Sequence, residues 1–262
     1  MCGSRDGTNT ALHMVSAFAT QSGLCLGQEG TRGKGHEIVA IKALLDALKL
    51  KDCTVTIDAT GCQKEIAEKI IEQGGNYLLA LKANQGTLFE AVAQFYAEGH
   101  RHGFGSLTVS RFETLEKDHG RIETRRHVWV SKLDWMEPSL RGDWKNLAGV
   151  GMVERQREIK GKVSVERTFY IGSKGVSSAQ ALAEAARGHW GVENRLHWVL
   201  DVTFREDECR VRTGHAPRNL STIRKFLSLI HSARCRRYAV LRSRSVPHTS
   251  PNRHRHNAQS TP

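Results

Sequence analysis

The spacing of apolar positions changes along the chain, and each spacing predicts a different element. Two short apolar runs, 11–19 and 24–28, flank Gln21-Ser22-Gly23 and predict a β-hairpin. Alternating helices and strands follow: helices are predicted over 38–50, over 62–73 and from Asn84 onward, and buried strands over 53–57 and 77–82. This succession is typical of an α/β fold.

From about Thr108 the pattern changes to short alternating strands joined by turn residues, which predicts a β-rich insertion. The chain then returns to helix, with Ser177-Ser178 as a cap and Pro217 in the first turn of a later helix. The last 30 residues are rich in Arg, Ser, His and Pro and predict disorder. We therefore expect four parts: an α/β core (1–107), the β-rich insertion (108–171), C-terminal helices of the core (172–232) and a disordered basic tail (233–262).

The helix expected after Ala179 carries a polar cluster. Its apolar residues recur at helical spacing and predict a tryptophan-rich core face: Leu182, Trp190, Leu196, Trp198, Val199 and Leu200. His189, Glu193 and His197 are spaced four and four, so they lie on one helical face. They form either a solvated polar stripe opposite the core or a functional cluster.

Asp58 follows the strand predicted over 53–57. Open α/β sheets bind their ligands at the carboxyl ends of strands, which favours a functional role. Asp is also preferred as the N-terminal cap of a helix, where it gains from the helix dipole. The residues alone leave both interpretations open.

Composition restricts the class of protein. At 262 residues the chain can bury a substantial core, and no run approaches the ~18 apolar residues that span a bilayer. The six cysteines are scattered without a C-x-x-C pair, which argues against a zinc knuckle or a disulfide framework. We expect reduced thiols, a cytoplasmic location and no membrane partner.

The net charge of +12 favours a nucleic-acid partner, because Lys and Arg neutralise phosphates. Seven of these charges are arginines after His231, where there is no acid, so the first 230 residues carry only +5. Charge alone therefore leaves DNA binding open.

Four sequence words carry a resemblance: VTIDATGCQKEIA, YLLALKANQ, KDHGRIETR and HWGVENRLHWVLDVTFRED. They resemble, in order and spacing, the insertion-sequence transposases related to the H-repeat-associated proteins of Rhs elements. The similarity runs from about Ser4 to about Leu229. It implies an RNase H-like mixed sheet flanked by helices, with three carboxylates at one edge that bind two Mg²⁺ or Mn²⁺ ions. It also implies metal-dependent cleavage and transfer of double-stranded DNA at the ends of the insertion sequence, on the nucleoid. The resemblance leaves open whether the protein forms a homo-oligomer.

By this resemblance, Asp58 matches the second catalytic and metal-binding acid and Glu193 the third. His189 and Asn194 flank the glutamate, where they would orient it or position the scissile phosphate. Lys82, Arg121 and Arg125 would contact DNA, as would Arg126, although KDHGRIETR also fits a solvated strand pair.

The first acid of the family lies in a D-G-K word, on a central strand that precedes the segment CGSRDGTNTALH, and no residue of this chain matches it. Asp6 does not align with that word. We therefore expect the first central strand to be missing and this copy to be a truncated, inactive transposase. The alternatives are a metal-binding protein that uses the face with His189, Glu193 and His197, and a non-catalytic DNA-binding remnant.

Overall fold

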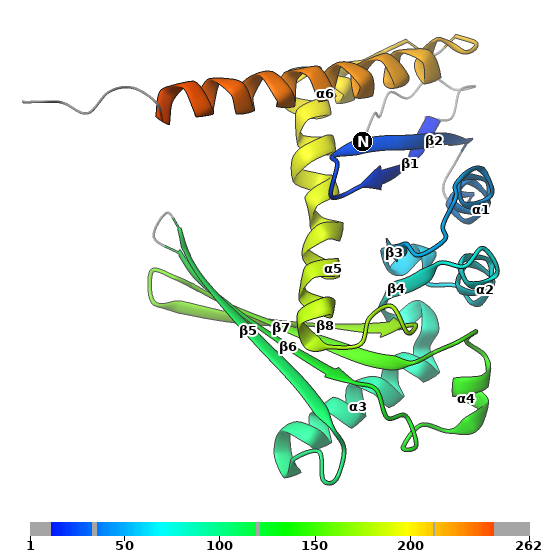
Figure 1. Ribbon diagram of the computed structural model, residues 1–262, viewed down its shortest axis with the longest axis vertical. Coiled ribbons are helices and arrows are strands. Elements are labelled where there is room, and N and C mark those ends of the chain that lie inside the picture. The colour runs from blue at the N-terminus through cyan, green and yellow to red at the C-terminus, as the bar shows by residue number, and fades with distance from the viewer. Residues whose placement is uncertain (1–11, 33–35, 119–120, 212, 244–262) are drawn as a thin grey trace, which may run out of the picture.

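The computed structural model describes residues 12–32, 36–118, 121–211 and 213–243 (Figure 1). Its strands are β1 (Leu12–Ala19), β2 (Leu24–Arg32), β3 (Thr54–Ile57), β4 (Asn76–Leu81), β5 (Val109–Asp118), β6 (Arg121–Val130), β7 (Gly149–Ile159) and β8 (Lys162–Gly172). Its α-helices are α1 (Glu37–Ala47), α2 (Lys64–Glu72), α3 (Gly86–His102), α4 (Pro138–Gly142), α5 (Ala179–Val192) and α6 (Ala216–Ser243). The predicted hairpin, strands and helices of the first 107 residues are confirmed.

Six strands form one mixed sheet in the order β3-β4-β8-β7-β6-β5. β3 and β4 are parallel, and all other neighbours are antiparallel. β8 pairs with β4 through Leu78 and Gly172, so the segment predicted as an insertion continues the sheet that holds β3 and β4. The expected mixed sheet flanked by helices is confirmed, whereas the domain boundaries remain predictions.

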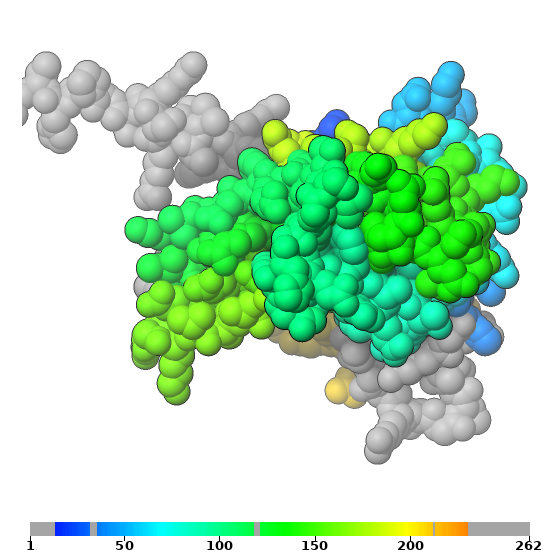
Figure 2. Space-filling model, turned by 90° about the horizontal axis from the view of Figure 1, so that it is seen from below, coloured from blue at the N-terminus to red at the C-terminus, as the bar shows by residue number. Residues whose placement is uncertain are grey.

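Alternation along β4 divides the core between the two faces of the sheet. Tyr77 and Leu79 join the larger apolar cluster, with residues of α2 and α3, and Leu78 joins the cluster beneath α5. Seen from below, α3 and the segment around α4 cover the first face (Figure 2). The far ends of β5 to β8 project beyond these helices, and β8 is exposed over its first six residues.

β1 and β2 form a separate two-stranded sheet that packs against α1 and α6. In α6, Lys225 is buried and its Nζ donates to Ser16 Oγ and to Gln28 Oε1, each at 2.6 Å. Within the described ranges, neither β1 nor β3 has a strand on its second edge. The expected missing central strand would lie between these two edges, and it remains a prediction; Asp6 lies outside the described residues.

Two expectations about the C-terminal part are wrong. Leu196 and Leu200 are buried as predicted, but Trp190 and Trp198 are exposed, so the core face is aliphatic. The tail was expected to be disordered from residue 233, yet α6 continues to Ser243. Ala, Arg and Leu in that stretch have high helix propensity, which outweighs its poor apolar pattern. Residues 244–262 lie outside the described residues. Among the helices that the structure describes, none is both long and apolar enough to cross a membrane.

Candidate active site

Asp58 lies at the carboxyl end of β3, where the chain turns into a short 3₁₀ segment, Ala59–Gly61. Its Oδ1 accepts a hydrogen bond from the Gly61 backbone N–H at 3.3 Å. The turn is tight enough that a Cβ on Gly61 would lie 2.2 Å from Ile57 Cγ2. Asp58 therefore caps this turn rather than α2, and its carboxylate stays exposed with one oxygen engaged in the cap.

The next parallel strand ends at the same edge. Lys82 follows β4 and is exposed, and Asn84 Nδ2 donates to the carbonyl oxygen of Ala59 at 2.7 Å. This bond joins the segment after β4 to the turn that carries Asp58. The sequence did not predict this structural role of the Asn84 amide, although Asn84 belongs to YLLALKANQ, one of the four segments that carry the family resemblance.

Glu193 follows α5 without a break in the helical path. Ser178 caps α5 as predicted, because its Oγ accepts from the Ala181 N–H at 3.1 Å. Two π-helical segments, Glu193–His197 and Val199–Thr203, continue the helix. Glu193 opens the first of them and is exposed, as is Asn194. Such wide turns are frequent at functional sites.

His189 connects the two elements that carry these carboxylates. Its Nδ1 lies 3.2 Å from Thr56 Oγ1, two residues before Asp58 on β3. Burial lowers the pKa of His189 below its usual value. The charges of Asp58 and Glu193 and the hydrogen bond with Thr56 raise it, but burial outweighs them. The imidazole is therefore neutral at pH 7, and it is close enough to both acids to interact with them electrostatically. Thr56 could have been identified from the sequence, because alternate strand residues share a face.

The predicted face with His189, Glu193 and His197 is not a metal cluster. His197 is exposed, and in the described part of the chain no group of three His, Cys, Asp or Glu side chains is arranged to hold a metal ion. Asp58 and Glu193 nonetheless offer carboxylate oxygens, the hard ligands that suit Mg²⁺ or Mn²⁺. The donor chemistry fits such an ion, but the described residues supply only part of a coordination sphere.

The arginines predicted to contact DNA are held by carboxylates on β5 to β7. Arg125 forms ion pairs with Glu116 at 3.2 Å and with Glu123, and Arg121 lies 3.7 Å from Glu123. Arg126, on the opposite face, pairs with Glu113 and Glu154. These arginines are therefore paired within the sheet, and each remains partly exposed, so their contact with DNA stays a prediction.

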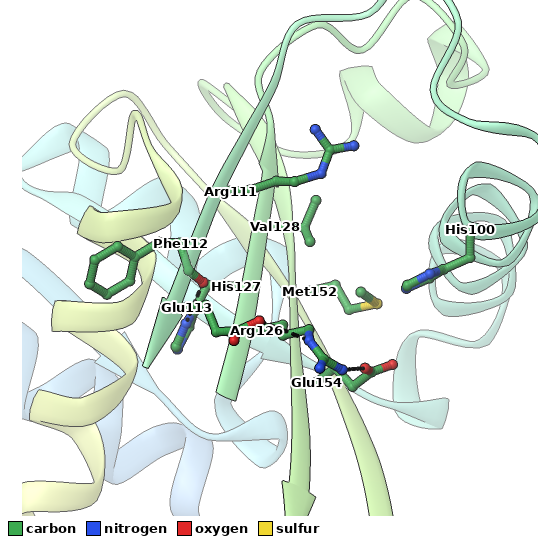
Figure 3. Close-up of a pocket in the computed structure, with 9 residues that line it drawn as sticks. All are labelled: His100, Arg111, Phe112, Glu113, Arg126, His127, Val128, Met152 and Glu154. Carbon is green, nitrogen blue, oxygen red and sulfur yellow. Dashed lines mark hydrogen bonds and ion pairs between the residues drawn. The ribbon is translucent and has the colours of Figure 1, made fainter. Parts of the chain in front are cut away.

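A pocket opens between α3 and β5 to β7, on the face opposite α5 (Figure 3). Val128 and Met152 form its apolar floor, and Arg126 crosses it between Glu113 and Glu154. None of the residues predicted as catalytic lines it.

Comparisons with known proteins place the chain among transposases. The family model described as "Transposase DDE domain" matches residues 3–230. The chain is 40% identical over 238 residues to the "Putative transposase YncI" of Escherichia coli O157:H7, which covers 89% of this chain and 60% of that protein. It is 40% identical over 220 residues to the "H repeat-associated putative transposase YhhI" of Escherichia coli strain K12, covering 82% of this chain and 56% of the relative. The chain thus spans less than two thirds of the length of these relatives.

Proposed function

We propose that this chain, which belongs to the transposase DDE domain family, contributes the larger part of a metal-dependent site for the cleavage and transfer of DNA strands at the ends of an insertion sequence. One observation carries the proposal. The contact between His189 and Thr56 joins the strand that ends at Asp58 to the helix that continues into Glu193, and both carboxylates are exposed.

In this proposal Asp58 and Glu193 bind the metal through hard carboxylate oxygens. Bound Mg²⁺ or Mn²⁺ ions supply charge stabilisation for the attacking and leaving oxygens of an in-line phosphoryl displacement. Neutral His189 keeps the strand and the helix aligned. Asn194, next to Glu193, positions the scissile phosphate through its side-chain amide.

DNA phosphates contact positive side chains at the carboxyl end of β4 and along β6. Lys82 is exposed at the end of β4, beside the strand that precedes Asp58. The side chains of Arg121 and Arg125 keep exposed fractions of 44% and 25% in spite of their ion pairs, so part of each side chain faces solvent. Such contacts position a duplex without reading its sequence.

The 262 residues alone are inactive in this proposal, because Asp58 and Glu193 are two of the three acids that the family uses. Loss of one electrostatic element of a catalytic site typically costs ~10²–10³ in rate. A polypeptide that also carries the D-G-K word, on a strand between β1 and β3, would complete the set.

The test is strand cleavage of DNA that carries the ends of the element, in Mg²⁺ or Mn²⁺. We expect no cleavage by the 262 residues alone and cleavage by a protein extended with the D-G-K segment. In the extended protein, Asp58→Ala and Glu193→Ala should each abolish cleavage and leave DNA binding intact. Glu184→Gln is the matched control, since Glu184 is an exposed carboxylate on α5, and it should cleave normally. Cleavage that survives Glu193→Ala, or cleavage by the 262 residues alone, would overturn the proposal.

A further inference from the structure

The hairpin of β7 and β8 extends beyond the helices that cover the sheet (Figure 1). β4 pairs with β8 only from Phe169 to Gly172. The preceding part of β8 therefore has β7 on one side and, within the described residues, no strand on the other. The first six residues of β8 are exposed. We call this stretch, residues 162–167, the free edge of β8.

The turn of the hairpin shows which backbone groups point outward from the free edge. Lys160 and Gly161, with φ of 51° and 76°, form a two-residue turn between the paired residues Ile159 and Lys162. The pair that closes such a turn exchanges both of its hydrogen bonds, and hydrogen-bonded pairs then alternate along the two strands. The backbone N–H and C=O groups that point away from β7 therefore belong to Val163, Val165 and Arg167.

The free edge lacks several features that keep edge strands from pairing with other chains. Such features are prolines, bulges, charged side chains and covering segments. The free edge has no proline, its register with β7 is regular, and Val163 and Val165 are 56% and 55% exposed. The opposite edge strand, β5, is partly covered, because Ser110 Oγ accepts a hydrogen bond from the N–H of Ala179 in α5. The free edge of β8 is therefore open to a further strand.

The side chains of the free edge are complementary to themselves in an antiparallel register. When Ser164 lies opposite Ser164 of a second copy, Val163 faces Val165 of that copy. The same register places Lys162 opposite Glu166. Alternate strand residues share a face, so the valines pack together on one face and the opposite charges meet on the other. Glu166 is available for this contact, because its side chain is 69% exposed in spite of its ion pair on β7.

The backbone fits this register as well. Val163 and Val165 both turn their N–H and C=O groups outward, so the two residues can exchange both hydrogen bonds across the interface. Lys162 and Glu166 then form a non-hydrogen-bonded pair, the kind in which opposed side chains lie closer together. A register centred on Val165 would instead place Val163 opposite Arg167 and lose both matches.

We propose that two copies of this chain pair through the free edge of β8, antiparallel and centred on Ser164, so that their sheets join into one. The partner is a second copy because the free edge matches itself in both charge and apolar side chains, as a two-fold interface requires. This inference is independent of the proposed function. Two short strands bury a small area, so we expect a weak dimer with a dissociation constant in the micromolar range.

Oxidative cross-linking of Ser164→Cys tests the register directly. Opposed residues of a non-hydrogen-bonded pair have Cα atoms about 4.5 Å apart, within the range of roughly 4.4–6.8 Å for disulfides. The 262-residue chain with this substitution should form a covalent dimer, and mass spectrometry should identify a disulfide between the two copies of residue 164. The unmodified chain gives the background of its six cysteines.

Two further cysteine variants are matched controls on the same hairpin. Lys160→Cys places an exposed thiol at the turn, far from its own copy in this register, and should give only the background. Val165→Cys lies beside Ser164, but its copy is displaced by two residues, which puts their Cα atoms beyond the reach of a disulfide. It should also give only the background.

A charge exchange tests the pairing without any cysteine. In Lys162→Glu two carboxylates oppose each other at both symmetric positions, and in Glu166→Lys two ammonium groups do so. Like charges opposite each other destabilise strand pairing, so each variant alone should dimerise about tenfold more weakly. A mixture of the two variants restores opposite charges at both positions and should dimerise like the unmodified chain. Sedimentation velocity over a range of concentrations measures all four samples.

Four results would overturn the inference. The first is a chain that stays monomeric at high micromolar concentration and gives no cross-link through Ser164→Cys. The second is cross-linking of Val165→Cys in place of Ser164→Cys, which means a different register. The third is a dimer that neither charge variant weakens, because it must form through another surface. The fourth is protection of the Val163 and Val165 amides from hydrogen exchange that does not depend on concentration, because a segment of the same chain would then cover the edge. If Ser164→Cys does not fold, the mixture of charge variants decides.

Discussion

Two regions of the molecule use carboxylates in opposite ways. At the end of β3 and after α5, Asp58 and Glu193 are exposed, and Asp58 accepts a capping hydrogen bond from the Gly61 backbone N–H. On β6 and β7, Glu123 and Glu154 have side chains only 3% and 8% exposed and are paired with arginines. Asp58 lies at the carboxyl end of β3 and Glu193 lies in the helical path after α5, whereas Glu123 and Glu154 lie within paired strands.

The difference separates the proposed ligand-binding acids from structural acids. A carboxylate that is buried among guanidinium groups is paired with their positive charge, and removing it leaves these charges without a partner. An exposed carboxylate keeps lone pairs for a cation at little cost to the fold. The comparison therefore predicts large stability effects on β6 and β7 and small ones at the candidate active site.

The largest effect is expected for Glu123→Gln. The amide keeps the size of the side chain but removes the charge that Arg125, Arg155 and Arg157 share. Breaking a buried pair from one side typically costs about 3–5 kcal/mol. Urea unfolding measures this change, and a variant as stable as the unmodified chain would remove the distinction between the two regions.

Glu154→Gln should have a smaller and pH-dependent effect. Burial raises the pKa of Glu154, but hydrogen bonds from Arg167 and Arg126 outweigh it and hold the pKa below the usual 4.5. Because the folded pKa is lowered, the carboxylate stabilises the fold above pH 4.5, and this contribution disappears as the pH falls through the folded value. At pH 7 the variant should lose about 1.5–3 kcal/mol, the range for hydrogen bonds to a charged group. Unfolding curves at several pH values should show a flatter acid slope for the variant, and an identical slope would contradict this role.

Thr56→Val should have an intermediate effect that connects stability to the site. Valine keeps the shape of the threonine but removes the hydroxyl that meets His189 Nδ1. Loss of such a hydrogen bond costs about 0.5–1.5 kcal/mol, and the helix with Glu193 should become more mobile relative to β3. Thermal unfolding gives the stability change. The histidine ring signals in NMR spectra should shift, and unchanged signals would mean that this contact does not form in solution.

The smallest stability effects are expected for Asp58→Asn and Glu193→Gln. Asparagine can still accept the hydrogen bond from the Gly61 N–H, and Glu193 is exposed. Substitutions at such positions usually change stability by less than about 0.5 kcal/mol. A loss as large as that of Glu123→Gln, measured under the same conditions, would make either acid a structural residue.

The sequence predicted the parts of this molecule that local patterns determine. Periodicity located the hairpin, the β3 strand before Asp58 and the cap at Ser178, because each depends on neighbours in the chain. It failed where distant segments meet. The pairing of Leu78 with Gly172 makes one sheet of what looked like two units, and no local pattern encodes it.

The exposure of Trp190 and the burial of Glu123 are further examples of features that no local sequence pattern predicts. Both reverse the usual preference of the residue type, and both result from tertiary contacts between α5, β6 and β7. The family resemblance predicted Asp58 and Glu193 as site acids, but the contact between the elements that carry them, His189 to Thr56, required the structure.

The most direct test of the division between ligand-binding and structural acids is Mn²⁺ binding to the 262-residue chain, followed by electron paramagnetic resonance. Asp58→Asn and Glu193→Gln should each weaken Mn²⁺ binding by about tenfold or more, since affinity for hard cations depends on the charge and number of the oxygen ligands. Glu166→Gln, which removes an exposed carboxylate on β8, is the matched control and should bind normally. If Mn²⁺ binds equally well to the chain without Asp58 or Glu193, the two acids do not form a metal site.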